Sequence, residues 1–219
     1  MVATLSHRLQ SVGYAQRYKM HFFIIINVIF LIILTIIVNK NITTGFDEKI
    51  LAWFDSIESL TLNSFFILIT CLGSLWMLLP TVAGITTGLI FYGYRMAAIV
   101  FNIGFIGAVS TTYIMKSLIE RPRPELFENM TTMPYDSSYP SAHTTQAFAF
   151  ALMLSLLVYS LDTSFKTSFA SLFLSFAVMV GISRMYLQVH FPSDVIAGVL
   201  VASIWTGIVI YLINSGVLR

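Results

Sequence analysis

The strongest constraint on this chain is a series of long apolar runs that recur along most of its length. A helix needs about 20 consecutive apolar residues to cross the hydrocarbon core of a bilayer. In that environment every backbone polar group must be paired, which favours helices. We therefore predict an all-α, polytopic membrane protein with one domain over residues 1–219 and six transmembrane helices, at 21–38, 74–92, 96–115, 142–161, 167–187 and 194–213.

The composition agrees with this fold class and excludes others. Charged residues make up only 10% of the chain and hydrophobic residues 57%, whereas soluble domains carry about 25% charged residues. Too little polar surface remains to coat a soluble globule. The net charge is only +2 and no basic stripe occurs, so nucleic acid is not expected as a partner. No obligatory protein partner is evident, and the lipid bilayer is the expected surrounding.

The N-terminal segment, residues 1–20, carries Arg8, Arg17 and Lys19 before the first apolar run. This charge pattern is typical of a signal sequence, but no small-x-small cleavage site follows the run. We therefore predict a retained signal anchor with a cytoplasmic N-terminal segment.

Charged and apolar residues alternate with helical spacing after the first predicted span. The segment 39–62 is therefore predicted to be an amphipathic helix at the membrane interface. The apolar stretch that follows, 62–94, is too long for one straight helix, and Gly73 and Pro80 interrupt it. We interpret 62–71 as a partly embedded approach to the second span.

Polar residues gather at the ends of predicted spans in three clusters: the loop 116–142, the start of the fourth span, and the segment 183–194. Alternate span ends face the same side of a membrane, so all three clusters are predicted to meet at one membrane face. The candidate site residues in them are Lys116, Arg123, Ser141, Ala142, His143, Arg184, His190 and Asp194.

The distribution of lysine and arginine sets the predicted orientation. With the N-terminus inside, six of these residues lie inside and six outside, which decides nothing by itself. If Lys116, Arg123 and Arg184 are left out of the count as candidate site residues, six lysines and arginines remain inside and three outside. We predict a bacterial inner-membrane protein with cytoplasmic termini and a non-cytoplasmic catalytic loop at 116–142.

The cations favour binding of a phosphate group. Lys116, Arg123 and Arg184 offer fixed positive charge, and the planar fork of arginine grips two phosphate oxygens at once. Ser141 and the unpaired amides at the start of the fourth span, including that of Ala142, add an anion site. Phosphoryl transfer needs such charge at the equatorial oxygens and a nucleophile in line with the leaving group.

His190 is predicted to be that nucleophile, because a neutral histidine held in the right tautomer attacks phosphorus. Asp194, four residues later, is placed to accept the other N–H of the imidazole. His143 is predicted to donate a proton to the leaving oxygen. The acidic residues of the loop, Asp136 among them, are expected to be solvated rather than catalytic.

Two histidines and an aspartate also match a zinc-ligand set. Three cations in the same site would repel a divalent ion. We therefore predict no metal and no other cofactor.

These residues resemble the signature of the type 2 phosphatidic acid phosphatase family. Its elements are Lys-x6-Arg-Pro, Pro-Ser-Gly-His and Ser-Arg-x5-His-x3-Asp. The first and third match in full here, but Ala142 stands where the family has glycine. The resemblance implies a phosphohistidine intermediate on His190, His143 as the acid and no metal. It also implies a membrane lipid substrate such as phosphatidylglycerophosphate, phosphatidate, undecaprenyl diphosphate or a lipid A phosphate.

Hydrolysis of a lipid phosphate or diphosphate is therefore the predicted function. A phosphotransferase that passes the group to another lipid would use the same site. A transporter of anionic lipids would carry charges in the middle of its spans, whereas here nearly all stand at span ends. A catalytically inactive lipid-binding homologue would be expected to lack His143, His190 or Asp194, and all three are present.

Overall fold

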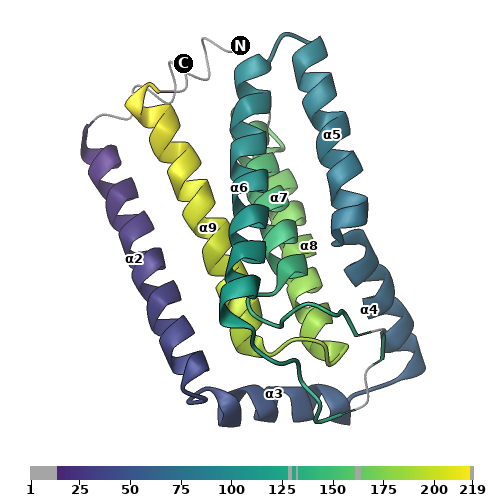
Figure 1. The fold of residues 1–219 in the computed structure, drawn as a ribbon. Coiled ribbons are helices and arrows are strands. Elements are labelled where there is room, and N and C mark those ends of the chain that lie inside the picture. Colours follow the sequence, from purple (N-terminus) through teal and green to yellow (C-terminus); the bar gives the residue numbers. More distant parts are fainter. Residues whose placement is uncertain (1–13, 128–129, 132, 161–163, 218–219) are drawn as a thin grey trace.

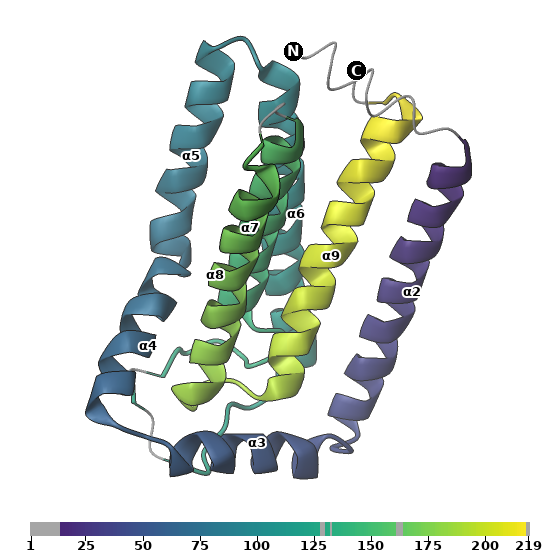
Figure 2. The same cartoon turned by 180° about the vertical axis from the view of Figure 1, so that it is seen from behind.

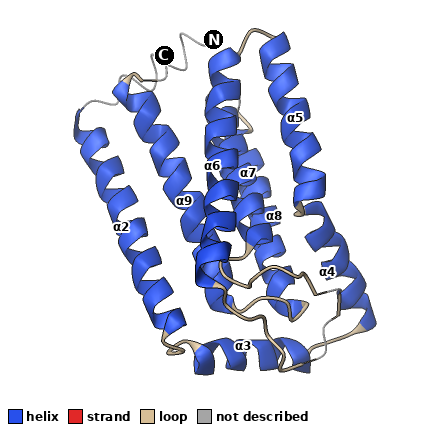
Figure 3. Cartoon of the chain, viewed as in Figure 1, coloured by secondary structure: helices blue, strands red, loops and turns tan. Residues whose placement is uncertain are grey.

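The computed structural model describes residues 14–127, 130–131, 133–160 and 164–217. The described residues form eight helices and no strand (Figure 3). The helices are α2 (Tyr14–Asn39), α3 (Thr44–Ser56), α4 (Leu60–Leu72), α5 (Leu75–Phe91), α6 (Arg95–Ile119), α7 (Ala142–Ser160), α8 (Lys166–Tyr186) and α9 (Pro192–Ser215). The all-α prediction is confirmed.

Five of these helices are long and apolar enough to cross a membrane, and α4 with α5 forms a sixth, bent candidate. The predicted starts and ends agree with the helices to within a few residues, except that α2 begins at Tyr14 rather than at residue 21. Most of the predicted cytoplasmic segment, residues 1–13, lies outside the described residues. The expectation of a multi-pass membrane fold is met by these six candidate spans.

Most helices run side by side, whereas α3 lies across one end of the bundle (Figures 1 and 2). The α6–α7 loop and the α8–α9 connection reach that same end, which we call the α3 end. The start of α2 and the end of α9 lie at the opposite end. The arrangement brings segments more than 100 residues apart in the chain to one place, because α3 folds back against α8 and α9.

The α4–α5 pair bends by 42° where Gly73 ends α4 and Ser74 begins α5 in an extended conformation. A Cβ on Gly73 would lie only 2.5 Å from a methyl group of Val180, so glycine lets α4 approach α8 closely. The predicted interruption at Gly73 is thus confirmed. The predicted interruption at Pro80 is wrong, because Pro80 lies inside α5. Membrane helices tolerate an internal proline because neighbouring groups satisfy the freed carbonyl.

Small residues bring the central helices together. α7 packs against α6, α8 and α9, and its alanines at 147, 149 and 151 are fully or almost fully buried. Such residues allow the close helix approach that is typical of membrane bundles. Large apolar side chains point outward instead, among them Phe22, Ile25, Phe30 and Leu172, as expected where the neighbouring molecules are lipid tails.

The predicted amphipathic segment 39–62 contains α3, which presents two different faces. Asp47, Leu51 and Phe54 are buried at helical spacing, and they face the ends of α8 and α9. Phe46 and Trp53 are more than half exposed. The location of α3 at a membrane surface stays a prediction, but its outer face has the aromatic character that suits one.

Candidate active site

The three polar clusters meet at the α3 end. Lys116 lies in the last turn of α6 and Arg184 in the last turn of α8. His143 lies in the first turn of α7 and Asp194 in the first turn of α9. These side chains, with Arg123 and His190 from the connecting loops, are mostly buried although they are charged or polar. Two helices, α6 and α8, therefore end at the site, and two, α7 and α9, begin there.

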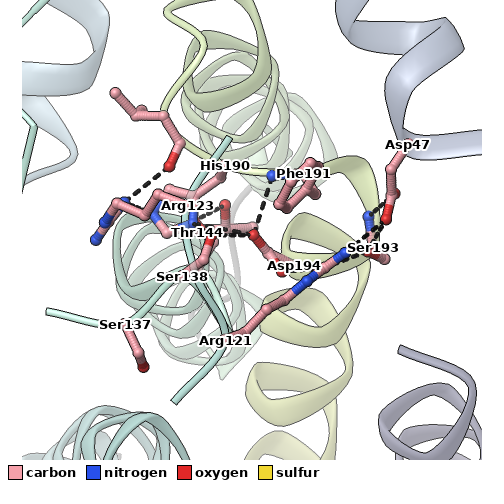
Figure 4. A network of polar contacts seen from close by, with 12 residues as sticks. Asp47, Arg121, Arg123, Ser137, Ser138, Thr144, His190, Phe191, Ser193 and Asp194 are labelled. Atoms are coloured by element: carbon pink, nitrogen blue, oxygen red, sulfur yellow. Dashed lines mark hydrogen bonds and ion pairs between the residues drawn. The ribbon is translucent and has the colours of Figure 1, made fainter. Parts of the chain in front are cut away.

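His190 and Asp194 form the centre of this arrangement (Figure 4). The Nδ1 atom of His190 lies 3.4 Å from Oδ2 of Asp194. Ser138 lies between them: its Oγ donates to the same carboxylate oxygen at 2.5 Å and lies 3.3 Å from Nδ1. The backbone N–H of Phe191 also donates to Oδ2 at 2.9 Å, which closes the N-terminus of α9.

Arg123 fixes the tautomer of His190. Its Nη1 lies 3.1 Å from Nε2 of His190 and donates to the carbonyl of Val189 at 2.8 Å. A guanidinium has no acceptor, so Nε2 must accept and its lone pair is free of a proton. Nδ1 then carries the hydrogen, which points toward Asp194 and Ser138. The neutral tautomer that the predicted nucleophile would need is therefore the one that the neighbours of His190 favour.

The electrostatic surroundings also keep His190 neutral. The side chain is 1% exposed, and burial lowers the pKa of the His190 imidazole well below 6.5. The positive charges of Arg123, Arg184 and Lys116 lower this pKa further. An imidazole in these surroundings is neutral at neutral pH, and its unprotonated Nε2 faces the N–H of Arg123.

The three predicted phosphate-binding cations differ in how they are paired. Lys116 contacts the backbone carbonyl of Ser137 and the carboxylate of Asp136, the latter at 3.1 Å. Arg184 donates to the hydroxyl of Thr70 from α4, and its Nε is buried with no hydrogen-bond partner among the described residues. A buried donor without a partner is costly, so this guanidinium has capacity for a further acceptor.

Asp136 is more than the solvated loop charge that the sequence suggested. Its Oδ1 accepts from Arg123 Nη2 at 2.6 Å, and its backbone carbonyl accepts from Arg123 Nε at 2.9 Å. Partial burial raises the pKa of the Asp136 carboxyl, but the charge of Lys116 and hydrogen bonds from Lys116 and Arg123 outweigh burial and lower it below 3.8. The group is therefore ionised throughout the neutral range.

A second layer of polar contacts, which the sequence did not predict, links α3 to Asp194 (Figure 4). Arg121 donates to Asp194 at 2.5 Å and to Asp47 at 2.8 Å. Asp47 also accepts from the backbone N–H of Ser193 at 3.0 Å and from its hydroxyl at 2.6 Å. The guanidinium of Arg121 packs over the ring of Phe191, 4.2 Å from its centroid.

A cavity of about 480 Å³ adjoins these residues. Its polar wall contains Lys116, Arg123, Asp136, Ala142, His143, Gln146, Arg184 and His190. Its apolar wall comes from α5, with Leu75, Trp76, Leu79 and Pro80. Five of the predicted side chains, together with Ala142, therefore share one cavity, whereas Ser141 and Asp194 do not line it.

Comparison with known proteins now identifies the family. Residues 94–216, more than half of the chain, match the PAP2 superfamily. The chain belongs to the PAP2 superfamily. The matched region begins just before α6 and contains all eight predicted site residues. The assignment from the motifs and the prediction of a phosphatase of this family are confirmed.

Two curated PAP2 relatives have named activities. The undecaprenyl-diphosphatase of Sulfolobus acidocaldarius is 31% identical over 163 residues, which cover 73% of this chain and 74% of the relative. Phosphatidylglycerophosphatase B of Bacillus subtilis is 30% identical over 173 residues, which cover 78% and 84%.

Two solved PAP2 structures share the fold. The transmembrane PAP2-type phosphatidylglycerolphosphate phosphatase of Bacillus subtilis superposes with a TM-score of 0.79 at 28% identity and covers 86% of this chain and 94% of its own. LpxE of Aquifex aeolicus superposes with a TM-score of 0.62 at 21% identity, over 75% and 94%. The second likeness concerns the fold alone.

The departure from the PAP2 signature at Ala142 has a structural explanation. Ala142 is the first residue of α7 and does not have a positive φ angle. Glycine's conformational freedom is therefore not required at this position. Ser141, just before it, is fully buried and donates its backbone N–H to the carbonyl of Asp194 at 3.0 Å. Its hydroxyl accepts from Thr144 at 2.9 Å, so this serine joins the starts of α7 and α9.

Proposed function

We propose that this PAP2 protein hydrolyses a membrane lipid phosphate or diphosphate through a phosphohistidine intermediate on His190. The observation that carries the proposal is the position of His190. Its Nδ1 faces Asp194 and Ser138, and the residue lines the cavity that also contains His143 and three cations. The candidate substrates are phosphatidylglycerophosphate, undecaprenyl diphosphate, phosphatidate and lipid A phosphates.

In the first step the N–H of Arg123 turns from Nε2 to a phosphoryl oxygen, and the freed Nε2 lone pair attacks phosphorus. A P–N bond forms while the bond from phosphorus to the lipid oxygen breaks. His143 gives its proton to that leaving oxygen. Asp194 accepts the hydrogen bond of Nδ1–H and stabilises the positive charge that develops on His190. Lys116, Arg123 and Arg184 balance the charge on the phosphoryl oxygens.

In the second step water attacks the phosphorus and the P–N bond breaks. His143, now neutral, takes a proton from the attacking water. The products are inorganic phosphate and a lipid alcohol, or a lipid monophosphate if the substrate is a diphosphate. His190 returns to its neutral state and His143 to its protonated state.

The apolar wall of the cavity supports a lipid substrate. Trp76 is 91% exposed on the outside of the bundle and also lines the cavity. The wall formed by α5 therefore continues from the outer surface to the cationic residues. A substrate that keeps its chains among lipids while its phosphate reaches Arg123 fits this continuity.

The orientation in the membrane is also part of the proposal. The catalytic end faces the periplasm or exterior of a bacterial inner membrane, with both termini in the cytoplasm. Arg121 supports this view, because its side chain is 12% exposed and paired with two carboxylates. We therefore leave Arg121 out of the count as well, and the remaining lysines and arginines number six inside against two outside.

The test is phosphate release from a panel of lipid phosphates in detergent with excess chelator. Wild type should release phosphate from at least one lipid, and His190→Ala should abolish release. His21→Ala, which removes a histidine whose ring contacts that of Tyr211 near the opposite end, is the matched control and should remain active. Rapid quenching with a radiolabelled substrate should trap an acid-labile, base-stable label on wild type. No release from any lipid by folded wild type would refute hydrolysis.

A further inference from the structure

Asp136 occupies a position that the proposed chemistry leaves unexplained. Its carboxylate contacts Arg123 Nη2 at 2.6 Å and Lys116 Nζ at 3.1 Å. The proposed function assigns both of these cations to the substrate phosphate. A carboxylate and a phosphate offer the same kind of oxygen to an arginine fork, so the two anions compete for the same donors.

Asp136 also stands between two cavities. The first is the cavity of about 480 Å³ with the apolar wall from α5. The second, of about 670 Å³, is lined by the loop after α6 and contains Glu120, Glu125 and Ser137. Tyr113, Lys116, Arg123, Pro134 and Asp136 line both. An anion that moves from the first cavity to the second must pass this group of residues.

We propose that Asp136 is a resident counter-ion that competes with phosphate for Lys116 and Arg123 and so speeds the release of inorganic phosphate into the second cavity. This inference rests on the proposed function. When a phosphoryl group binds the two cations, the carboxylate gives way. When inorganic phosphate leaves, the carboxylate takes its place, and the cations never lose an anionic partner.

The backbone makes this exchange feasible without loss of geometry. Arg123 Nε donates to the carbonyl oxygen of Asp136, and Lys116 donates to the carbonyl of Ser137. The Ser137 hydroxyl donates in return to the carbonyl of Lys116 at 2.8 Å. These backbone contacts hold both cations when the side chain of Asp136 swings away. That side chain is 40% exposed, so it has room to move.

The variant Asp136→Asn separates competition from positioning. It keeps the shape of the side chain and the backbone contacts, and it removes the negative charge, while an NH2 group replaces one of the two acceptor oxygens. We expect the inhibition constant of inorganic phosphate to fall about three- to fivefold, because a partly exposed ion pair contributes about one kcal/mol at most. The control is Glu125→Gln. Glu125 also lines the second cavity, and its carboxylate pairs with no cation among the described residues. This variant should leave the constant within about twofold of wild type, since exposed charges are screened.

Two measurements make the outcome decisive. The first is inhibition of lipid hydrolysis by phosphate for wild type, Asp136→Asn and Glu125→Gln. The second is equilibrium binding of phosphate by calorimetry in the His190→Ala background, with and without Asp136→Asn. Tighter phosphate binding by Asp136→Asn in both the inhibition and the calorimetry measurements supports the inference. An unchanged or weaker affinity overturns it and makes Asp136 a positioning residue.

The calorimetry also separates this inference from the proposed function. If wild type hydrolyses no lipid, the proposed function fails, but the comparison of phosphate affinities still tests Asp136. If hydrolysis occurs and the affinity does not rise in Asp136→Asn, only the role of Asp136 fails.

Discussion

Replacing Asp47 by alanine removes the acceptor that joins α3 to the start of α9. The carboxylate of Asp47 is fully buried and accepts three hydrogen bonds, from Arg121 at 2.8 Å and from the N–H and hydroxyl of Ser193 at 3.0 and 2.6 Å. In Asp47→Ala the N–H and hydroxyl of Ser193 would be left buried without an acceptor, and one branch of the Arg121 fork would lose its partner.

The expected cost follows from these contacts. Deleting one partner of a buried ion pair costs about 3–5 kcal/mol. Arg121 keeps its contact to Asp194, so we expect the lower end, about 3 kcal/mol. For a chain of this length that corresponds to a fall of about 6–12 °C in Tm. The maximal rate measured well below Tm should fall less than about tenfold, because Ser138 still holds Asp194.

The assay is thermal unfolding of the protein in detergent, followed by tryptophan fluorescence, together with the rate of lipid hydrolysis. Glu48→Ala is the matched control, because Glu48 is the next residue of α3 and is exposed. It should change Tm by no more than a degree or two, as surface substitutions contribute about 0.5 kcal/mol or less. Equal melting temperatures for the two variants would refute a stabilising role for the Asp47 contacts.

Three further outcomes are expected. Ser138→Ala should lower kcat about tenfold with KM unchanged. The reason is that Ser138 contacts His190 and Asp194 but does not line the cavity. An unchanged kcat would contradict a role of Ser138 in holding this pair. Burial lowers the pKa of His190, so its imidazole should stay neutral as the pH falls through 6.5 and gain a proton only below it. Nitrogen NMR of labelled histidine, assigned with His190→Asn, checks this, and protonation at pH 6.5 or above contradicts it. Ala142→Gly should leave kcat within about twofold and cost up to about 1 kcal/mol of stability, measured by activity and thermal unfolding; a large gain in rate would mean that the turn needs glycine.

The sequence predicted the elements whose signals are local. Apolar runs located the spans because a bilayer fixes their length, and the helix ends placed the three clusters on one face. The error at Pro80 has the same origin, since the rule that proline ends a helix holds for water-exposed helices more than for membrane ones. In α5, Pro80 instead forms part of the apolar cavity wall.

The contacts that the sequence missed are those made across long chain separations. Asp47 and Ser193 are 146 residues apart, and Ser138 and Asp194 are 56 apart. No local pattern specifies that α3 folds back against α9. One signal was present for Asp47: it shares a helical face with the apolar Leu51 and Phe54, and a carboxylate on a buried face requires a partner.

The charges of the site predict which of the candidate cations would contribute most to binding a phosphate. Four cations, Lys116, Arg121, Arg123 and Arg184, face three carboxylates, Asp47, Asp136 and Asp194, so without the two histidines the net charge of these groups is +1.

The carboxylates are shared unevenly. Arg121 contacts two of them, whereas Lys116 and Arg123 share Asp136. Arg184 contacts only the hydroxyl of Thr70 among the described residues. Among the four cations, the charge of Arg184 is therefore neutralised least and the charge of Arg121 is neutralised most. A phosphate dianion should depend most on Arg184, so Arg184→Lys, which keeps the charge but loses the fork, should raise KM more than Arg121→Lys does. A larger rise in KM for the Arg121 variant would show that the charges are not divided in this way.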